Sequence, residues 1–309
     1  LGISAFGFYT LVISIAPILS VFDFGFSQAA IRNLALPGTS ENEKTKTWQT
    51  SFFFFGLVGL VLFLIVIGIF QFYLFHLTSI GSIIGRQGPP IMLVVAATVF
   101  LNHLNAHFMT HPQAEQRYDI YSLNAFISGS ANTWIAAVIA LIRPNVLLIF
   151  SVRLMGVLIT TVIMWLYSRR HFHDNYPKLH RDQFRKMISF GLKSFATRVF
   201  GVLEAYGLNF ILASFVAIQA VTYFSIPQNL IIKAAGGISM LTLSVFPLST
   251  SLLTMDGIAK LKKLIVWLQA CVVGLGLLAV LVIFAFGKPL LLLWLTNPEL
   301  VELAYPILQ

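Results

Sequence analysis

Long apolar stretches divide this sequence and limit what it can fold into. There are eight complete stretches and the beginning of a ninth near Pro298, and the eight cover residues 5–33, 50–75, 88–111, 120–142, 145–168, 188–214, 217–252 and 264–287. About 20 apolar residues cross the bilayer core as a helix. The stretches are too long and continuous for the strands of a membrane barrel. The sequence therefore predicts an all-α, polytopic membrane protein.

Composition supports the same class. Apolar residues make up 58% of the 309 residues and charged residues 10%, whereas a soluble domain carries about 25% charged residues. The longest stretch outside the apolar runs covers about residues 169–187, so no soluble domain fits. The single cysteine, Cys271, excludes an intrachain disulfide.

The basic residues are distributed between the two ends of the spans, which predicts the orientation of the chain. Arg86, Arg143 and Lys288 fall on one side, and the other side receives Lys44, Lys46, Arg117, Arg169, Arg170, Lys178, Arg181, Arg185, Lys186, Lys260, Lys262 and Lys263. The positive-inside rule makes the second side cytoplasmic. We therefore expect cytoplasmic loops near 34–49, 112–119, 169–187 and 253–263. Because the net charge of +9 is spread along short loops, it does not indicate nucleic-acid binding.

An internal repeat is indicated by one recurring offset. Residues 5–10 align with 220–225, and residues 58–60 align with 273–275, both 215 positions apart. Coincidence in a Leu-, Gly- and Phe-rich sequence is the alternative. A real repeat predicts two parallel six-helix halves, truncated here so that the first helix and the last helices of about twelve are missing.

The repeat also predicts the domain organisation. Residues 1–170 would form an N-terminal bundle that lacks its first helix, and residues 171–187 a basic cytoplasmic linker. Residues 188–309 would form a truncated C-terminal bundle.

Several motifs resemble one family of transporters. They are LGISAFGFY (1–9), SVFDFGFS (20–27), AIRNLA (30–35), AEQRYDIY (114–121), YFSIPQ (223–228) and VFPLS (245–249). In this order they resemble the polysaccharide and O-antigen flippases (Wzx-type) of the MOP superfamily. The resemblance implies a V-shaped, two-bundle transporter fold around a central cavity.

The resemblance also implies a function. The protein would flip an undecaprenyl-diphosphate-linked oligosaccharide across the bacterial inner membrane, from the cytoplasmic to the periplasmic leaflet, by alternating access. The product would serve O-antigen, capsule or exopolysaccharide synthesis. A coupling ion, H⁺ or Na⁺, is an implied partner, and a polysaccharide polymerase and a chain-length regulator are further candidates.

Charged residues inside the predicted spans are the candidate functional residues, because charges in a membrane face a bundle interior or a water-filled cavity. Five are basic and two acidic: Arg32, Arg153, Lys193, Arg198 and Lys233, and Asp23 and Glu204. Pairing both acids leaves three positive charges, so the cavity would attract anions. We expect Arg198, Lys233 and Arg153 to contact the diphosphate, with Lys193 and Arg32 nearby, and Asp23 or Glu204 to bind the coupling ion.

Other interpretations of these charges remain open. Arg198 or Lys233 could form a structural ion pair with one of the two acids, and Lys193 and Arg32 could extend to the interface. The stretch 188–214 nevertheless predicts a wall that faces water, because its polar residues lie within about 160° of one helix face. These residues are Lys193, Ser194, Thr197, Arg198, Gly201, Glu204 and Asn209.

Three histidines in one predicted span are candidate metal ligands. His103, His107 and His111 are spaced to share one helix face, which can bind zinc, but no carboxylate lies nearby before Glu115. A polar cavity wall is favoured, with no metal site. The loop histidines His171, His173 and His180 are expected to be solvated. Aromatic residues near the span ends are expected to lie at the membrane interface; they are Trp48, Trp165, Tyr167, Trp267 and Trp294.

Two other functions are compared with the flippase. A MATE-like multidrug or organic-cation antiporter would need an acid-rich cavity, which is the opposite sign. A membrane-embedded polysaccharide polymerase or ligase would need a large periplasmic loop, and the loops here are short. The sequence has no Walker A loop, nucleophile elbow or HExxH motif, so we expect neither an enzyme nor a cofactor.

Overall fold

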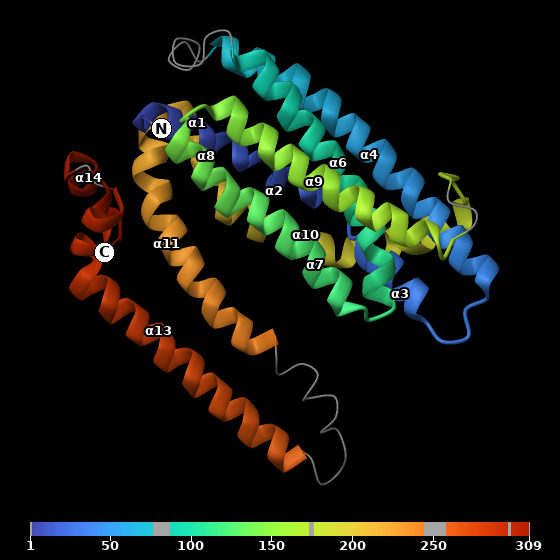
Figure 1. The fold of residues 1–309 in the computed structure, drawn as a ribbon. Helices are drawn as coiled ribbons and strands as arrows, with labels where there is room; N and C mark the ends of the chain where they lie inside the picture. The colour runs from blue at the N-terminus through green and yellow to red at the C-terminus, as the bar shows by residue number, and fades with distance from the viewer. Residues whose placement is uncertain (1, 77–86, 173–175, 244–257, 296–297, 309) are drawn as a thin grey trace. The chain divides into compact units, whose positions relative to one another are not determined.

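The described residues are helical almost throughout. The structure, a computed structural model, describes residues 2–76, 87–172, 176–243, 258–295 and 298–308, and all the regular elements within these ranges are helices (Figure 1). The elements are α1 (Ile3–Ile13), α2 (Ile15–Ser20), η1 (Val21–Asp23), α3 (Phe26–Ala35), α4 (Glu41–His76), α6 (Gly88–Ala114), α7 (Tyr118–Ser130), η3 (Ala131–Ile135), α8 (Ala136–Ile142), α9 (Val146–Arg169), α10 (Arg181–Phe215), α11 (Ile218–Leu243), α13 (Ile258–Leu295) and α14 (Pro298–Leu308).

Six segments of the described chain are long and apolar enough to cross a membrane. They are Ile3–Asp23, Glu41–Gly68, Gly88–Ala114, Tyr118–Ile142, Val146–Arg169 and Ile265–Leu293. Each corresponds to one of the eight predicted spans. The predicted span 188–214 lies in α10, which contains the shorter apolar segment Val199–Phe215, and part of the predicted span 217–252 lies outside the described residues. The prediction of an all-α, polytopic membrane protein is confirmed.

Two helices begin earlier in the chain than the predicted spans that they contain. α4 begins at Glu41, so much of the predicted loop 34–49 is helical. α10 begins at Arg181, within the predicted linker 171–187. Glu, Lys and Arg are good helix formers, and the acidic first turn of α4, with Glu41 and Glu43, complements the helix dipole.

The chain packs as two compact units, residues 1–218 and 219–309. In the first unit, α6 packs against both α4 and α9, and α10 packs against α2, α3 and α4. In the second unit, α13 packs against α14. α10 was predicted to open the C-terminal bundle, and the division into two six-helix bundles stays a prediction.

One pair of helix starts matches the offset of the predicted repeat. α1 begins at Ile3 and α11 at Ile218, which are 215 positions apart. The second pair of aligned segments, residues 58–60 and 273–275, lies within α4 and α13. The internal repeat itself stays a prediction.

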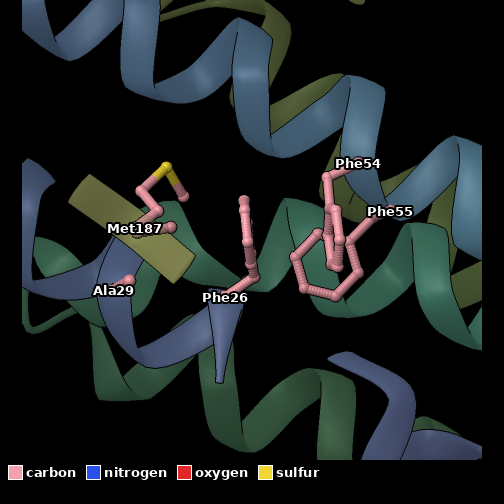
Figure 2. Packing of buried hydrophobic residues seen from close by; sticks show 6 residues of the cluster. Phe26, Ala29, Phe54, Phe55 and Met187 are labelled. Carbon is pink, nitrogen blue, oxygen red and sulfur yellow. The ribbon is translucent and has the colours of Figure 1, made fainter. Parts of the chain in front are cut away.

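Aromatic side chains form the core where α3, α4 and α10 meet. The ring of Phe26 on α3 stacks on that of Phe54 on α4, with centroids 3.8 Å apart, and Met187 of α10 is fully buried in the same cluster (Figure 2). A second cluster surrounds Trp48, which stacks on Phe172 at 4.5 Å. Trp48 is 0% exposed, so its ring packs inside the protein, and its depth in the membrane stays a prediction.

Candidate functional site

The predicted phosphate-binding residues are described only in part. Lys193 and Arg198 lie in α10 and Lys233 in α11, but their side chains lie outside the described residues. The structure therefore shows the surroundings of only one of the three proposed diphosphate contacts, Arg153. The grouping of Arg153, Arg198 and Lys233 stays a prediction.

Arg153 of α9 is held by neutral hydrogen-bond acceptors. Its Nε donates to Asn132 Oδ1 at 2.9 Å and its Nη1 donates to the Tyr9 hydroxyl at 2.9 Å. The guanidinium carbon lies 5.8 Å from the centroid of the Tyr9 ring, within range of a cation–π attraction. Asn132 in turn donates to Ser128 Oγ at 3.3 Å. We call Tyr9, Ser128, Asn132 and Arg153 the Arg153 cluster.

Local backbone features bring the Arg153 cluster together. Asn132 belongs to η3, a π-helical turn that interrupts the span Tyr118–Ile142. Such turns are often found at functional sites. On α9, Gly156 lies against Ala131, where an added Cβ would overlap the alanine methyl group. This close approach lets α9 pack directly on the turn that carries Asn132.

Tyr9 and Asn132 are not among the site residues predicted from the sequence. Asn132 had one signal, a polar amide in the middle of an apolar span. Tyr9 had none, because a tyrosine near a span end is ordinary in a membrane protein. Only the packing of α1 beside α9 shows that it meets Arg153.

Asp23 stabilises a break in the first predicted span. The stretch 5–33 was predicted to be one continuous span, and this is wrong: the helix breaks after η1, where Phe24 (φ 47°) and Gly25 (φ 73°) adopt left-handed conformations. The Asp23 carboxylate accepts hydrogen bonds from Gly25 N at 3.0 Å and Ser27 Oγ at 2.6 Å. These bonds satisfy donors at the beginning of α3 that the broken helix would leave free.

The break lies directly against α10. A Cβ placed on Gly25 would lie 2.5 Å from the carbonyl oxygen of Gly191, and a Cβ on Gly191 would overlap the Phe24 carbonyl. Phe24 also packs on Phe195 of α10, with ring centroids 4.9 Å apart. We call this contact between the η1–α3 break and α10 the glycine seam.

Arg32 also interacts with α10. It is exposed, and its guanidinium lies 4.8 Å from the centroid of the Phe190 ring. This cation–π contact is compatible with either interpretation of Arg32, as a cavity residue or as a cation at the interface.

Three residues of the predicted water-facing stripe on α10 have a described burial. Gly201 and Glu204 are exposed. Asn209 is buried, and its Nδ2 donates to Ser14 Oγ at 2.9 Å. The prediction that Asn209 faces water is therefore wrong, because an amide can lie on the same arc of a helix and still be covered by a neighbouring element.

The membrane histidines do not line a cavity. His103, His107 and His111 are buried at 4%, 0% and 5% exposure, which contradicts the prediction of a polar cavity wall. His107 bonds Ser51 Oγ through Nδ1 at 3.0 Å and stacks on Phe52. Within the described ranges, no group of three His, Cys, Asp or Glu side chains could hold a metal ion.

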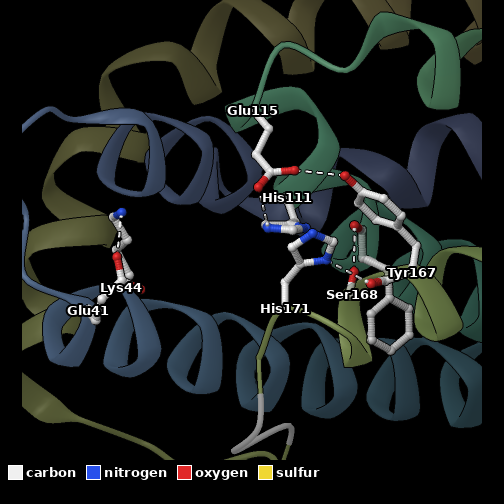
Figure 3. A network of polar contacts seen from close by, with 8 residues as sticks. Glu41, Lys44, His111, Glu115, Tyr167, Ser168 and His171 are labelled. Atoms are coloured by element: carbon white, nitrogen blue, oxygen red, sulfur yellow. Dashed lines mark hydrogen bonds and ion pairs between the residues drawn. The ribbon is translucent and has the colours of Figure 1, made fainter.

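A network of polar side chains links the C-terminal end of α6 to the C-terminal end of α9. Glu115 bonds His111 Nε2 through Oε1 at 3.3 Å and accepts the Tyr167 hydroxyl through Oε2 at 2.7 Å. The His171 ring lies 4.8 Å from that of His111, and its Nδ1 is 3.1 Å from the Tyr167 carbonyl oxygen (Figure 3). His171 is exposed, as expected for a loop histidine.

His180 is tied to α4 and is not simply solvated. Its Nε2 lies 2.9 Å from Gln49 Oε1, and its backbone N–H donates to Thr50 Oγ1 at 3.2 Å. Burial, together with the nearby Lys178 and Lys46 charges, holds the pKa of His180 below its ordinary value of 6.5. The third loop histidine, His173, lies outside the described residues.

Comparison with known proteins gives two matches. A family model described as polysaccharide biosynthesis protein matches residues 1–253. A Shigella flexneri protein named "Putative O-antigen transporter" is 22% identical over 255 residues, which are 80% of this chain and 59% of that protein. The chain therefore spans about three fifths of the length of this relative. No solved structure matches significantly.

Proposed function

The chain belongs to the polysaccharide biosynthesis protein family, and we propose that it flips an undecaprenyl-diphosphate-linked oligosaccharide across the bacterial inner membrane by alternating access. The family match bears out the resemblance to polysaccharide flippases drawn from the sequence. The name of the Shigella flexneri relative points to an O-antigen unit as the cargo. In this proposal the chain moves its cargo without making or breaking covalent bonds.

The observation that carries the proposal is the charge of Arg153. On insertion scales, placing a charged side chain at the centre of a membrane helix costs about 2.5–3.5 kcal/mol. Arg153 lies seven residues into α9, about 10 Å along its axis. Its hydrogen-bond partners, Asn132 and Tyr9, are neutral, so they satisfy donors without cancelling the charge. A cation kept in this way favours an anionic cargo and disfavours the organic cations of a MATE-like antiporter.

The glycine seam supports a role in alternating access. It joins a helix break of the predicted N-terminal bundle to the first helix of the predicted C-terminal bundle, close to the predicted cytoplasmic ends of both. Glycine allows two backbones to touch, and an aromatic layer around Phe24 surrounds the contact. We propose that the seam closes the cytoplasmic side of the cavity and opens when cargo enters.

The two acids suit different roles. Asp23 is buried and both its oxygens accept hydrogen bonds at the helix break, which suits a structural role. Glu204 is exposed on α10, and in this proposal its face of the helix lines the water-filled cavity. We therefore propose Glu204 as the coupling residue for H⁺ or Na⁺. A polysaccharide polymerase and a chain-length regulator would act on the cargo after release.

Reconstitution tests the proposed function. The intact protein is placed in liposomes with a fluorescent undecaprenyl-diphosphate oligosaccharide, and the fraction that becomes accessible to a quencher on the opposite side is measured. Wild type is expected to flip it, and Arg198→Ala and Lys233→Ala to slow flipping. Lys186→Ala, which removes an exposed charge near the beginning of α10, is the control. Wild-type liposomes that flip no faster than empty ones contradict the proposal.

The predicted orientation is tested separately. Single cysteines replace Lys46, Arg117 or Lys178 in a Cys271→Ser background, and intact cells are treated with a membrane-impermeant maleimide. These positions are expected to react only after the inner membrane is opened, because the proposal places them in the cytoplasm. Labelling in intact cells would reverse the orientation.

A further inference from the structure

We propose that the Arg153 cluster is a preorganised binding point for a phosphate or diphosphate group, in which Tyr9 and Asn132 are positioning residues. The proposal rests on the proposed function and adds to it. Arg153 alone was expected from the sequence to contact the anion. The new elements are the two neutral side chains that fix its guanidinium and the reason why both must stay neutral.

The hydrogen bonds leave donors for a ligand. An arginine guanidinium has five N–H donors in a rigid fork. Two are used, one at Nε by Asn132 and one at Nη1 by Tyr9. Among the described residues the other three have no acceptor, and all of them are on the terminal nitrogens Nη1 and Nη2. Two oxygens of one phosphate can accept from such a pair.

The neutrality of the acceptors decides what the cluster can bind. An aspartate in place of Asn132 would have almost the same shape and would form a charge-assisted bond with Arg153. It would also cancel the positive charge. Among the described residues, no carboxylate forms an ion pair with Arg153. The cluster therefore holds the guanidinium in place and keeps its attraction for an anion.

Three elements fix the position of the guanidinium before any ligand arrives. Tyr9 comes from α1, Asn132 from η3, and Arg153 from α9. The contact of Gly156 with Ala131 lies one residue from Asn132 and one helical turn from Arg153. The Tyr9 ring also packs on Phe150, with centroids 5.4 Å apart. A side chain held from several directions loses little further freedom on binding.

The decisive variant is Asn132→Asp. It replaces an amide NH2 with an oxygen and leaves the shape and the Arg153 bond in place, so the fold is retained or stabilised. We expect at least a tenfold loss of flipping in liposomes, because the cation is now cancelled. Asn145→Asp, at the exposed N-cap of the same helix, adds the same charge and keeps the cap, and it should flip normally.

Two further variants test positioning. Tyr9→Phe keeps the ring and removes the acceptor, so it should slow flipping several-fold with an unchanged melting temperature. Arg153→Lys keeps the charge but loses the fork, and it should weaken anion binding more than a control such as Lys186→Arg. A purely structural cluster would instead show loss of stability in Tyr9→Phe and normal flipping in Asn132→Asp.

Inorganic pyrophosphate separates the failure of this inference from that of the proposed function. It should raise the melting temperature of purified wild type but not of Asn132→Asp. If wild type binds pyrophosphate in this way but flips no lipid-linked oligosaccharide, the proposed function fails and the binding point stands. If wild type flips the lipid and Asn132→Asp flips it equally well, the binding point is refuted. Equal stabilisation of both proteins by pyrophosphate also refutes it.

Discussion

The backbones of Gly25 and Gly191 touch, although 166 positions separate them in the sequence. A Cβ built on Gly25 would lie 2.5 Å from the Gly191 carbonyl oxygen, and one built on Gly191 would overlap the Phe24 carbonyl. Both neighbours are backbone atoms, which cannot turn aside as a flexible side chain can. The contact therefore depends on glycine at both positions.

Gly191→Ala tests the glycine seam. We expect a loss of about 1–3 kcal/mol in the stability of the closed form, because the methyl group forces α10 away from the η1–α3 break. The melting temperature in nanodiscs and the rate of flipping measure the effect. Gly201→Ala is the matched control on the same helix, since no atom lies within 4 Å of its added Cβ. Normal stability and flipping in Gly191→Ala would refute the role of the seam.

Gly156→Ala tests the packing beneath the Arg153 cluster. The added methyl group would overlap that of Ala131, and overpacking of this kind costs about 1–3 kcal/mol. The double variant Gly156→Ala with Ala131→Gly should recover stability, because the overlap is removed. Gly129→Ala on α7, with open space around its Cβ, is the control. If the double variant did not recover stability, other contacts would determine the position of α9.

The acids Asp23 and Glu204 are expected to respond differently to substitution. Asp23→Ala should lower stability by about 1–3 kcal/mol, because it leaves donors at the helix break without an acceptor. Glu204→Gln should keep the melting temperature but abolish the acceleration of flipping by an imposed H⁺ or Na⁺ gradient. Flipping measured with and without each gradient distinguishes the two. A full gradient response in Glu204→Gln would exclude it as the coupling residue.

His180 should make stability depend on pH. Its pKa is lower in the folded state than the 6.5 of a free histidine, because of burial and the charges of Lys178 and Lys46. The unfolded chain therefore takes up the proton first as the pH falls. The contribution of His180 is full above about pH 6.5 and is lost as the pH falls from there through the lower folded-state pKa.

Melting temperatures measured from pH 8 to pH 5 check this dependence. His180→Asn should flatten the fall below pH 6.5. Lys178→Gln should reduce the fall, because one charge that opposes protonation is removed. The same slope in wild type and His180→Asn would mean that other groups control the acid response.

Much of the fold could be predicted because spanning a membrane is a local requirement. A segment such as 145–168 must be long and apolar to cross hydrocarbon, and the sequence shows this directly. The starts of α1 and α11 also lie at the offset of the predicted repeat. The helix break at Gly25 was not predicted. Counting the apolar residues of 5–33 does not detect a residue in the left-handed conformation.

The candidate site was predicted less completely, because it depends on how each helix is rotated. A helix that is apolar on all sides has no stripe to show which face meets its neighbour. Trp48, near a span end, therefore suggested the interface, although its ring is fully covered by Phe172 and other side chains. His107 suggested a cavity wall for the same reason, and it is packed between aromatic rings.

The sequence by itself determined that this chain is a bundle of membrane helices, that it resembles the polysaccharide flippases, and that Arg153 is an unusual charge within a span. Tertiary structure decided what Arg153 touches. Tyr9 is 144 positions away and Asn132 is 21 positions away, and neither distance is a helical spacing. Contacts between helices depend on close packing in three dimensions, which apolar length does not encode.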